Sequence, residues 1–76
     1  MGRLAGCTYS EVARRLRALG FEFDRSARGS HEIWRRADGS RTTVPCHPGE
    51  LPEGTVRASV RQAGLTVEEF LGGGRK

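Results

Sequence analysis

The fold of this chain is decided by residues 21–44, FEFDRSARGSHEIWRRADGSRTTV, in which three strand-like runs are separated by two turn signals. Apolar and charged residues alternate over 21–25, which is typical of a half-buried strand with Phe21 and Phe23 on its apolar side. Small residues follow, and 30–36 predicts a second strand. Asp38-Gly39 favours a type I′ hairpin turn, in which both central residues have positive φ. The stretch therefore predicts a three-stranded antiparallel sheet.

Helical spacing flanks this sheet on both sides. Residues 8–19 predict a helix that begins with a capping box between Thr8 and Glu11 and ends at Gly20. Its apolar stripe comprises Tyr9, Val12, Ala13, Leu16 and Leu19. Its arginines predict a solvated helix face: Arg14, Arg15 and Arg17. After the sheet, 55–63 predicts a second helix, and a further capping box over 66–69 begins a short last helix.

The predicted elements fit one small α+β domain. The third strand, 41–44, ends at Pro45, and the proline-rich stretch 45–54 predicts a structured crossing loop. Both helices have one apolar stripe, so we expect them to cover the same face of the sheet and leave the other face open. This is a double-stranded-RNA-binding-like α-β-β-β-α layout. We predict a single domain over 1–76, with an ordered core of about 8–71 and a flexible tail at 72–76.

Length and charge narrow the function classes. The chain has 76 residues and 13 Lys+Arg against 9 Asp+Glu, for a net charge of +4. This length excludes a two-lobed enzyme with a cleft between domains. No apolar run is long enough for a membrane span or a secretory signal, and two cysteines favour reduced thiols in a cytoplasmic protein. The basic excess indicates an anionic partner, either nucleic acid or an acidic protein.

Two histidines are the candidates for chemistry. His31 follows Gly29-Ser30 at the start of the second strand, where an approachable imidazole suits general acid–base catalysis. The alternative is an ordinary strand residue. His47 lies in a proline-flanked loop, as a second functional histidine or a surface residue. Cys46 and His47 are adjacent, a spacing that structural zinc sites avoid, so we predict no metal site.

The parity of the second strand bears on Trp34. In an extended strand His31, Ile33 and Arg35 share one face, and Trp34 lies on the other. If Ile33 faces the helices, Trp34 lies on the open face. There it can stack a nucleic-acid base or fill a partner's pocket, but it can equally belong to the core.

Short motifs stand in a specific order along almost everything between Tyr9 and Leu71. They are Leu19-Gly20-Phe21, Gly29-Ser30-His31, Val44-Pro45-Cys46-His47-Pro48-Gly49, Gly54-Thr55-Val56-Arg57 and Gln62-Ala63-Gly64-Leu65-Thr66-Val67-Glu68-Glu69-Phe70. Together they resemble HicA, the YcfA-like toxin of HicA–HicB toxin–antitoxin pairs. Glu32 stands where this family commonly has a histidine or a neutral residue, and arginines replace its common lysines.

The resemblance implies a double-stranded-RNA-binding-like fold and an endoribonuclease that cleaves mRNA without a metal or other cofactor. The family's catalytic histidine corresponds to His31, which we expect to act as the general base on the ribose 2′-OH. The resemblance also implies a HicB-type antitoxin partner that covers the active face and represses transcription of the pair.

The candidate RNA-binding residues are those nearest His31, together with the loop histidine: Arg28, Arg35, Arg36, Trp34 and His47. His47 is also a candidate for the acid that protonates the leaving oxygen. Two further functions fit the same sequence. One is a non-catalytic RNA-binding domain, and the other is a module that binds only an acidic protein.

Overall fold

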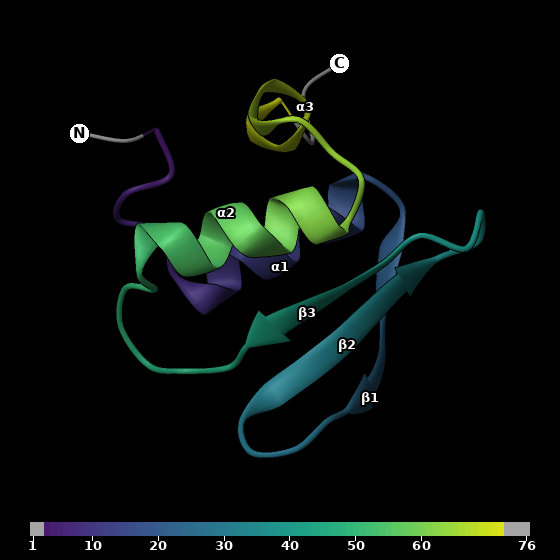
Figure 1. The fold of residues 1–76 in the computed structure, drawn as a ribbon, viewed down its shortest axis with the longest axis horizontal. Coiled ribbons are helices and arrows are strands. Elements are labelled where there is room, and N and C mark those ends of the chain that lie inside the picture. The colour runs from purple at the N-terminus through teal and green to yellow at the C-terminus, as the bar shows by residue number, and fades with distance from the viewer. Residues whose placement is uncertain (1–2, 73–76) are drawn as a thin grey trace.

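A computed structural model describes residues 3–72 as one antiparallel sheet packed against helices (Figure 1). In chain order the elements are α1 (Tyr9–Ala18), β1 (Phe21–Ser26), β2 (His31–Arg36), β3 (Arg41–Pro45), α2 (Glu53–Gln62) and α3 (Val67–Leu71). The strand order is β1-β2-β3, so β2 is central. The predicted α+β class and α-β-β-β-α order are confirmed. Of the predicted tail, residues 73–76 lie outside the described residues.

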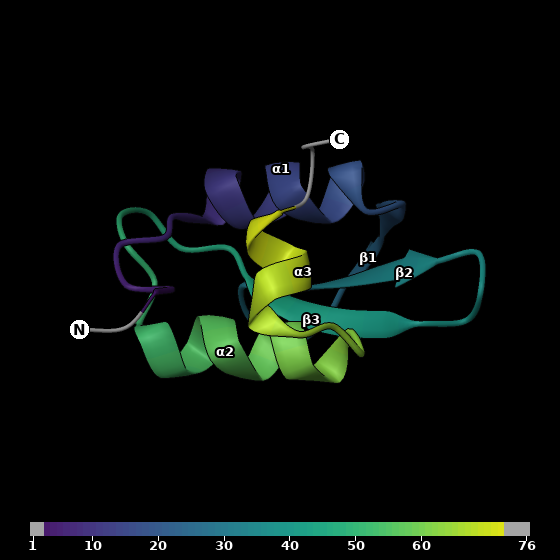
Figure 2. The same cartoon turned by 90° about the horizontal axis from the view of Figure 1, so that it is seen from above.

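The helices lie on one face of the sheet and leave the other open (Figure 1). Seen from above, α1 and α2 flank the sheet and α3 lies across the space between them (Figure 2). The largest fully buried side chains fill the layer between helices and sheet: Trp34, Phe21, Phe70, Leu4, Leu16, Val12, Val44, Val56 and Thr42. Within residues 3–72, no helix combines the length and apolar character needed to cross a bilayer.

The side-chain caps of α1 and α3 form as the sequence predicts, with one difference at α1. The Thr8 side chain accepts a hydrogen bond from the Glu11 N–H at 3.2 Å, but the Glu11 carboxylate lies 3.6 Å from the Arg15 guanidinium. Only half of the predicted capping box therefore forms, because the carboxylate has a cationic neighbour one turn along. At α3 both halves form, between Thr66 and Glu69.

The core extends beyond the predicted bounds at the N-terminal side. Leu4 is fully buried and Cys7 is nearly so, although the ordered core was expected to begin at about residue 8. The Leu51 N–H donates to the Cys7 carbonyl at 2.7 Å, which ties the crossing loop to this segment. The second helix also begins earlier than predicted, at Glu53, directly after Pro52.

The β2–β3 hairpin differs from the predicted type I′ turn. Gly39 has φ +97°, but Asp38 does not have positive φ. The Gly39 N–H donates to the Arg36 carbonyl at 2.9 Å, and the Arg36 N–H donates to the Ser40 carbonyl at 2.9 Å. The loop is therefore a three-residue one that ends in a left-handed glycine, which relieves Asp38 of a conformation costly for a residue with a Cβ.

Two aromatic residues of β1 have different environments. Phe21 is buried, but Phe23 remains 49 % exposed, so the expectation that both are buried is wrong for Phe23. Phe23 lies opposite Trp34 and contacts its ring edge-on, with 6.3 Å between ring centroids. The register shifts between Phe23 and Arg25, so β1 bulges there. Because β1 is an edge strand, Phe23 has a neighbouring strand on one side only, and part of its ring stays exposed.

The arginines of α1 are not a uniform solvated face. Arg14 is exposed, as predicted. Arg15 donates to the Leu71 carbonyl and lies over the Phe70 ring, 5.9 Å from its centroid. Arg17 lies over the Trp34 ring at 5.1 Å. The prediction is therefore wrong for Arg15, whose guanidinium joins α1 to α3.

Candidate functional site

Two loops meet at the end of the sheet where β2 begins. The Ala27 N–H donates to the His31 carbonyl at 2.8 Å, and the Cys46 N–H donates to the Ser30 carbonyl at 2.7 Å. Gly29 turns the first loop with φ +69°, and a Cβ added there meets no atom within 4 Å. Glycine is needed at this position for its backbone conformation and not for space. These contacts fix the main chain on both sides of His31.

His31 is exposed on the face of the sheet that the helices leave open. Its position follows from the parity of β2, because Trp34 is fully buried under the helices and residues of the opposite parity face outward. Ile33 and Arg35 share the open face with His31. The imidazole makes no hydrogen bond to another side chain within residues 3–72. The ring is therefore approachable by a large molecule, as an acid–base group acting on a polymer must be.

His47 lies at the same end of the sheet. It follows Pro45, the cross-strand partner of His31, by two residues, and both His47 and Cys46 are exposed. The Cys46–Ser30 main-chain bond brings the His47 loop beside the His31 loop. The structure therefore gathers the two histidines of the chain at one end, although they are far apart in sequence.

Two of the three arginines predicted to bind RNA are exposed near His31. Arg28 lies in the β1–β2 loop, and its carbonyl accepts the His31 N–H at 3.4 Å. Arg35 lies on the open face, two alternating positions along β2 from His31. Neither guanidinium pairs with a carboxylate in the part of the chain that the structure describes. Both are free to meet an anion.

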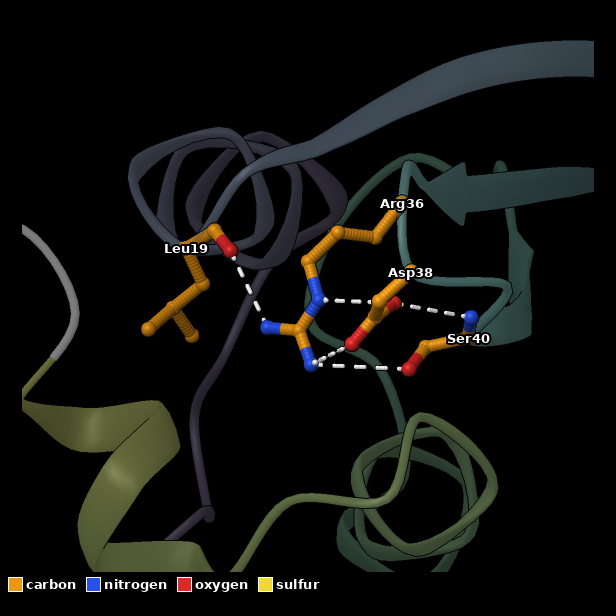
Figure 3. Close-up of polar contacts among 4 residues, drawn as sticks. All are labelled: Leu19, Arg36, Asp38 and Ser40. Atoms are coloured by element: carbon orange, nitrogen blue, oxygen red, sulfur yellow. Dashed lines mark hydrogen bonds and ion pairs between the residues drawn. The ribbon is translucent and has the colours of Figure 1, made fainter.

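Arg36 is committed to the fold instead (Figure 3). Its guanidinium donates to both carboxylate oxygens of Asp38 at 3.2 and 3.1 Å and to the Leu19 carbonyl at 3.1 Å. It also lies over the Phe21 ring at 4.7 Å. The hydrogen bond from Arg36, reinforced by those from Ser40, lowers the pKa of Asp38 to about 2. The prediction of Arg36 as an RNA ligand is not supported, because its parity places it on the helix-covered face.

Trp34 also lies away from the open face. Its ring has no exposed surface and packs between α1 and the sheet, so a nucleic-acid base cannot stack on it. The condition that placed it on the open face, Ile33 facing the helices, is wrong. The arrangement follows from size, because the larger aromatic surface gains more from burial than the isoleucine does.

The residue after His31, Glu32, has a hydrogen-bonded carboxylate. Glu32 Oε1 accepts the Tyr9 hydroxyl at 2.7 Å and the Trp34 indole N–H at 3.1 Å. Burial, followed by the hydrogen bond to Glu32 and its charge, raises the pKa of Tyr9 to about 12. The Glu32 carboxylate is therefore held toward α1 and away from the open face. Strand alternation alone places Glu32 on the opposite face from His31, and the bond from Tyr9, which fixes the carboxylate there, depends on a helix distant in sequence.

Metal-ligating residue types do not converge. Within residues 3–72, no three His, Cys, Asp or Glu side chains are placed to share an ion. Both cysteines are free thiols. Cys7 packs in the core, and burial is the largest of the effects that raise its pKa. Cys46 is exposed beside Ser30.

Comparison with known proteins identifies the family. The family model described as the HicA toxin of bacterial toxin–antitoxin systems matches residues 9–65, which include both histidines and all three strands. A search of curated proteins gives no match. Since the family match covers well over half of the sequence, the chain belongs to the HicA toxin family of bacterial toxin–antitoxin systems.

Proposed function

We propose that this HicA-family toxin is an endoribonuclease that cleaves mRNA, with His31 as the general base on the ribose 2′-OH. The observation that carries the proposal is the position of His31. It is exposed on the open face of the sheet, and its backbone is fixed by bonds from the two adjoining loops. A base must be held in place and still reach a proton on a polymer, and this position meets both needs.

The reaction needs no nucleophile from the protein, because RNA carries its own. The His31 imidazole takes the 2′-OH proton as the 2′-oxygen attacks the adjacent phosphorus. The bond from phosphorus to the 5′-oxygen breaks, and that oxygen takes up a proton. The products are a 2′,3′-cyclic phosphate and a free 5′-OH. General base catalysis of this kind contributes about 10²–10⁴-fold to a rate, which suits a slow, growth-arresting nuclease.

The neighbouring exposed residues have separate roles in this proposal. Arg28, in the loop beside His31, stabilises the negative charge that develops on the reacting phosphate, since guanidinium groups bind phosphate oxygens well. Arg35, further along β2, contributes to binding the RNA and not to the chemical step. His47 protonates the leaving 5′-oxygen from the adjoining loop. Trp34 and Arg36, both engaged in the fold, have no part in it. The reaction uses no metal and no small-molecule cofactor.

The proposed protein partner is a HicB-type antitoxin that covers the open face in the cytoplasm. Membership of the toxin family implies an antitoxin in general. A net charge of +4 and exposed arginines beside His31 favour an acidic surface on that partner. An antitoxin seated on the open face keeps RNA away from His31.

The purified chain and a defined RNA test the reaction directly. We expect cleavage in the presence of EDTA, products that end in a 2′,3′-cyclic phosphate, and no cleavage where the attacking ribose is replaced by 2′-deoxyribose. Loss of activity on chelation, or cleavage at a 2′-deoxy position, contradicts this mechanism. RNA that is bound in a salt-dependent manner but never cut indicates instead a non-catalytic RNA-binding domain.

A further inference from the structure

Two arginines face each other across the open side of the sheet. Arg35 of β2 lies directly opposite Arg41 of β3, and both are exposed. Neither guanidinium forms an ion pair or a side-chain hydrogen bond within residues 3–72. Glu22 of β1 is the other cross-strand neighbour of Arg35, but the two side chains form no ion pair. We call Arg35 and Arg41 the arginine pair.

Such a pairing is unfavourable for folding alone. Like charges directly opposite each other in an antiparallel sheet repel, whereas a carboxylate in either position attracts its neighbour. The chain places acidic partners beside other arginines, as at Arg25 with Asp24 and Arg57 with Glu53. Neither guanidinium of the arginine pair forms an ion pair within residues 3–72, although Glu22 lies beside Arg35, and an anion placed between the two guanidinium groups relieves their repulsion.

The arginine pair and His31 share one continuous surface. The positions between them on the open face are those of Arg25, Ile33 and Thr43, which lie opposite one another across the three strands. None of these is acidic. Along β2, His31 and Arg35 are four residues apart, or roughly 13 Å in an extended strand. Between His31 and the arginine pair, a polyanion therefore passes no carboxylate at these positions, and the nearest acidic residue of the open face is Glu22, at the β1 side of Arg35.

We propose that the arginine pair binds a backbone phosphate of the RNA strand that is cleaved at His31, so that the substrate lies along β2 across the open face. This inference rests on the proposed nuclease function for its substrate. Guanidinium groups suit the task, since they hold phosphate oxygens in a bidentate manner. The pair adds affinity for RNA longer than the reacting dinucleotide and takes no part in the chemical step.

Substrate length provides the kinetic test. A dinucleoside monophosphate has only the phosphate that reacts at His31, whereas an RNA of about ten nucleotides has others to offer the pair. In the double variant Arg35→Ala/Arg41→Ala, we expect KM for the longer RNA to rise roughly tenfold. The kcat for that RNA, and kcat/KM for the dinucleoside monophosphate, stay as in the wild type. The matched control is Arg14→Ala/Arg61→Ala, which removes the same charge from exposed positions on the helices.

A binding test with single-stranded DNA of the same length, which lacks the 2′-OH, separates this inference from the proposed function. We expect the double variant to bind this DNA roughly tenfold more weakly and with a shallower salt dependence than the wild type or the control. If that holds while the wild type cleaves no RNA, the phosphate site stands and the nuclease proposal fails.

Three results overturn the inference itself. The first is equal DNA binding by the double variant and the wild type. The second is a loss of affinity as large in the Arg14→Ala/Arg61→Ala control, which reduces the effect to net charge. The third is loss of binding to an acidic protein partner with nucleic-acid binding unchanged, which assigns the pair to a protein interface. Circular dichroism of each variant verifies that the sheet is intact.

Discussion

The main-chain N–H of Cys46 donates to the carbonyl oxygen of Ser30 across 2.7 Å. This bond joins the loop after β3 to the loop before β2, and it brings His47 and His31 to the same end of the sheet. The site is therefore made by backbone contacts between two loops and not by a pocket of side chains. We therefore expect activity to depend on the backbone conformation of these loops as well as on the histidines they hold.

Gly29→Ala tests this dependence. Gly29 has φ +69° and open space around its Cβ position, so an alanine there is strained without a clash. The matched control is Gly39→Ala, at φ +97° and equally open, in the hairpin at the far end of the sheet. Both changes are expected to lower the free energy of unfolding by about 1–2 kcal/mol. Only Gly29→Ala is expected to slow RNA cleavage under conditions where both proteins are folded. Equal loss of activity in the two variants contradicts the role of this loop.

Tyr9 predicts a specific pH dependence of stability. The pKa of Tyr9 is raised from 10.0 to about 12 in the folded chain. The folded state therefore retains the phenol proton where the unfolded state loses it. The contribution of Tyr9 to the free energy of unfolding is fully present below pH 10 and is lost as the pH rises from 10 to 12. Tyr9 is the single tyrosine of the chain, so tyrosinate absorbance reports its titration alone.

Two variants separate the causes of this shift. Glu32→Gln removes the carboxylate charge but not the burial, so the Tyr9 pKa is expected to fall only part of the way to its ordinary value. Tyr9→Phe removes the titrating group. The free energy of unfolding of this variant is therefore expected to lack the Tyr9-dependent decrease between pH 10 and 12. A Tyr9 pKa unchanged in Glu32→Gln is the result that refutes the contact.

Trp34 is expected to act on stability and not on RNA binding. Trp34→Phe loses the indole N–H bond to Glu32 and leaves unfilled volume under α1, which together cost about 1–3 kcal/mol. Chemical denaturation measures that loss. Nucleic-acid affinity of the folded variant is expected to match the wild type, because the ring has no exposed surface. Weaker binding with unchanged stability points instead to a base-stacking role.

Arg41→Glu is expected to change stability and binding in opposite directions. A carboxylate opposite Arg35 replaces repulsion with attraction, which raises the free energy of unfolding by about 0.2–1 kcal/mol. The same change lowers affinity for single-stranded nucleic acid. Arg61→Glu, on α2 and away from the strands, is the control and is expected to lack the gain in stability. A less stable Arg41→Glu variant argues against repulsion between Arg35 and Arg41.

The sequence predicted those features that depend on local signals. The N-caps Thr8 and Thr66 and the left-handed glycine after α1, Gly20, each act within one helical turn, and all three are present. The sheet and its order followed from alternating residues and turn signals. Whether His31 is exposed could not be decided before the parity of β2 was known.

The parity of β2 could not be read locally, because both faces of that strand carry charged residues. It is decided by Trp34, whose ring fills the space beneath α1, and by the Tyr9 hydroxyl bound to Glu32. Both depend on a helix distant in sequence. With that parity, Trp34 and Arg36 left the set of RNA-binding candidates.

The pairing of Arg35 with Arg41 could not be predicted, because it depends on the register of the β2–β3 hairpin. A two-residue type I′ turn at Asp38-Gly39 places Arg36 opposite Arg41. The three-residue loop that forms instead places Arg35 there, on the open face. One residue of difference in the turn thus decides which arginine of β2 lies opposite Arg41, and with it which face of the sheet Arg41 occupies. The Asp38-Gly39 turn signal was present in the sequence, but the predicted loop length of two residues was wrong.

The catalytic role of His31 is tested most directly by the rate at which His31→Ala cleaves a defined RNA, compared with the wild type and with His47→Ala. We predict that His31→Ala loses about 10²–10⁴-fold in rate while it binds the matching single-stranded DNA as the wild type does. His47→Ala is expected to lose less. Cleavage by His31→Ala at the wild-type rate, with binding intact, contradicts the assignment of His31 as the general base.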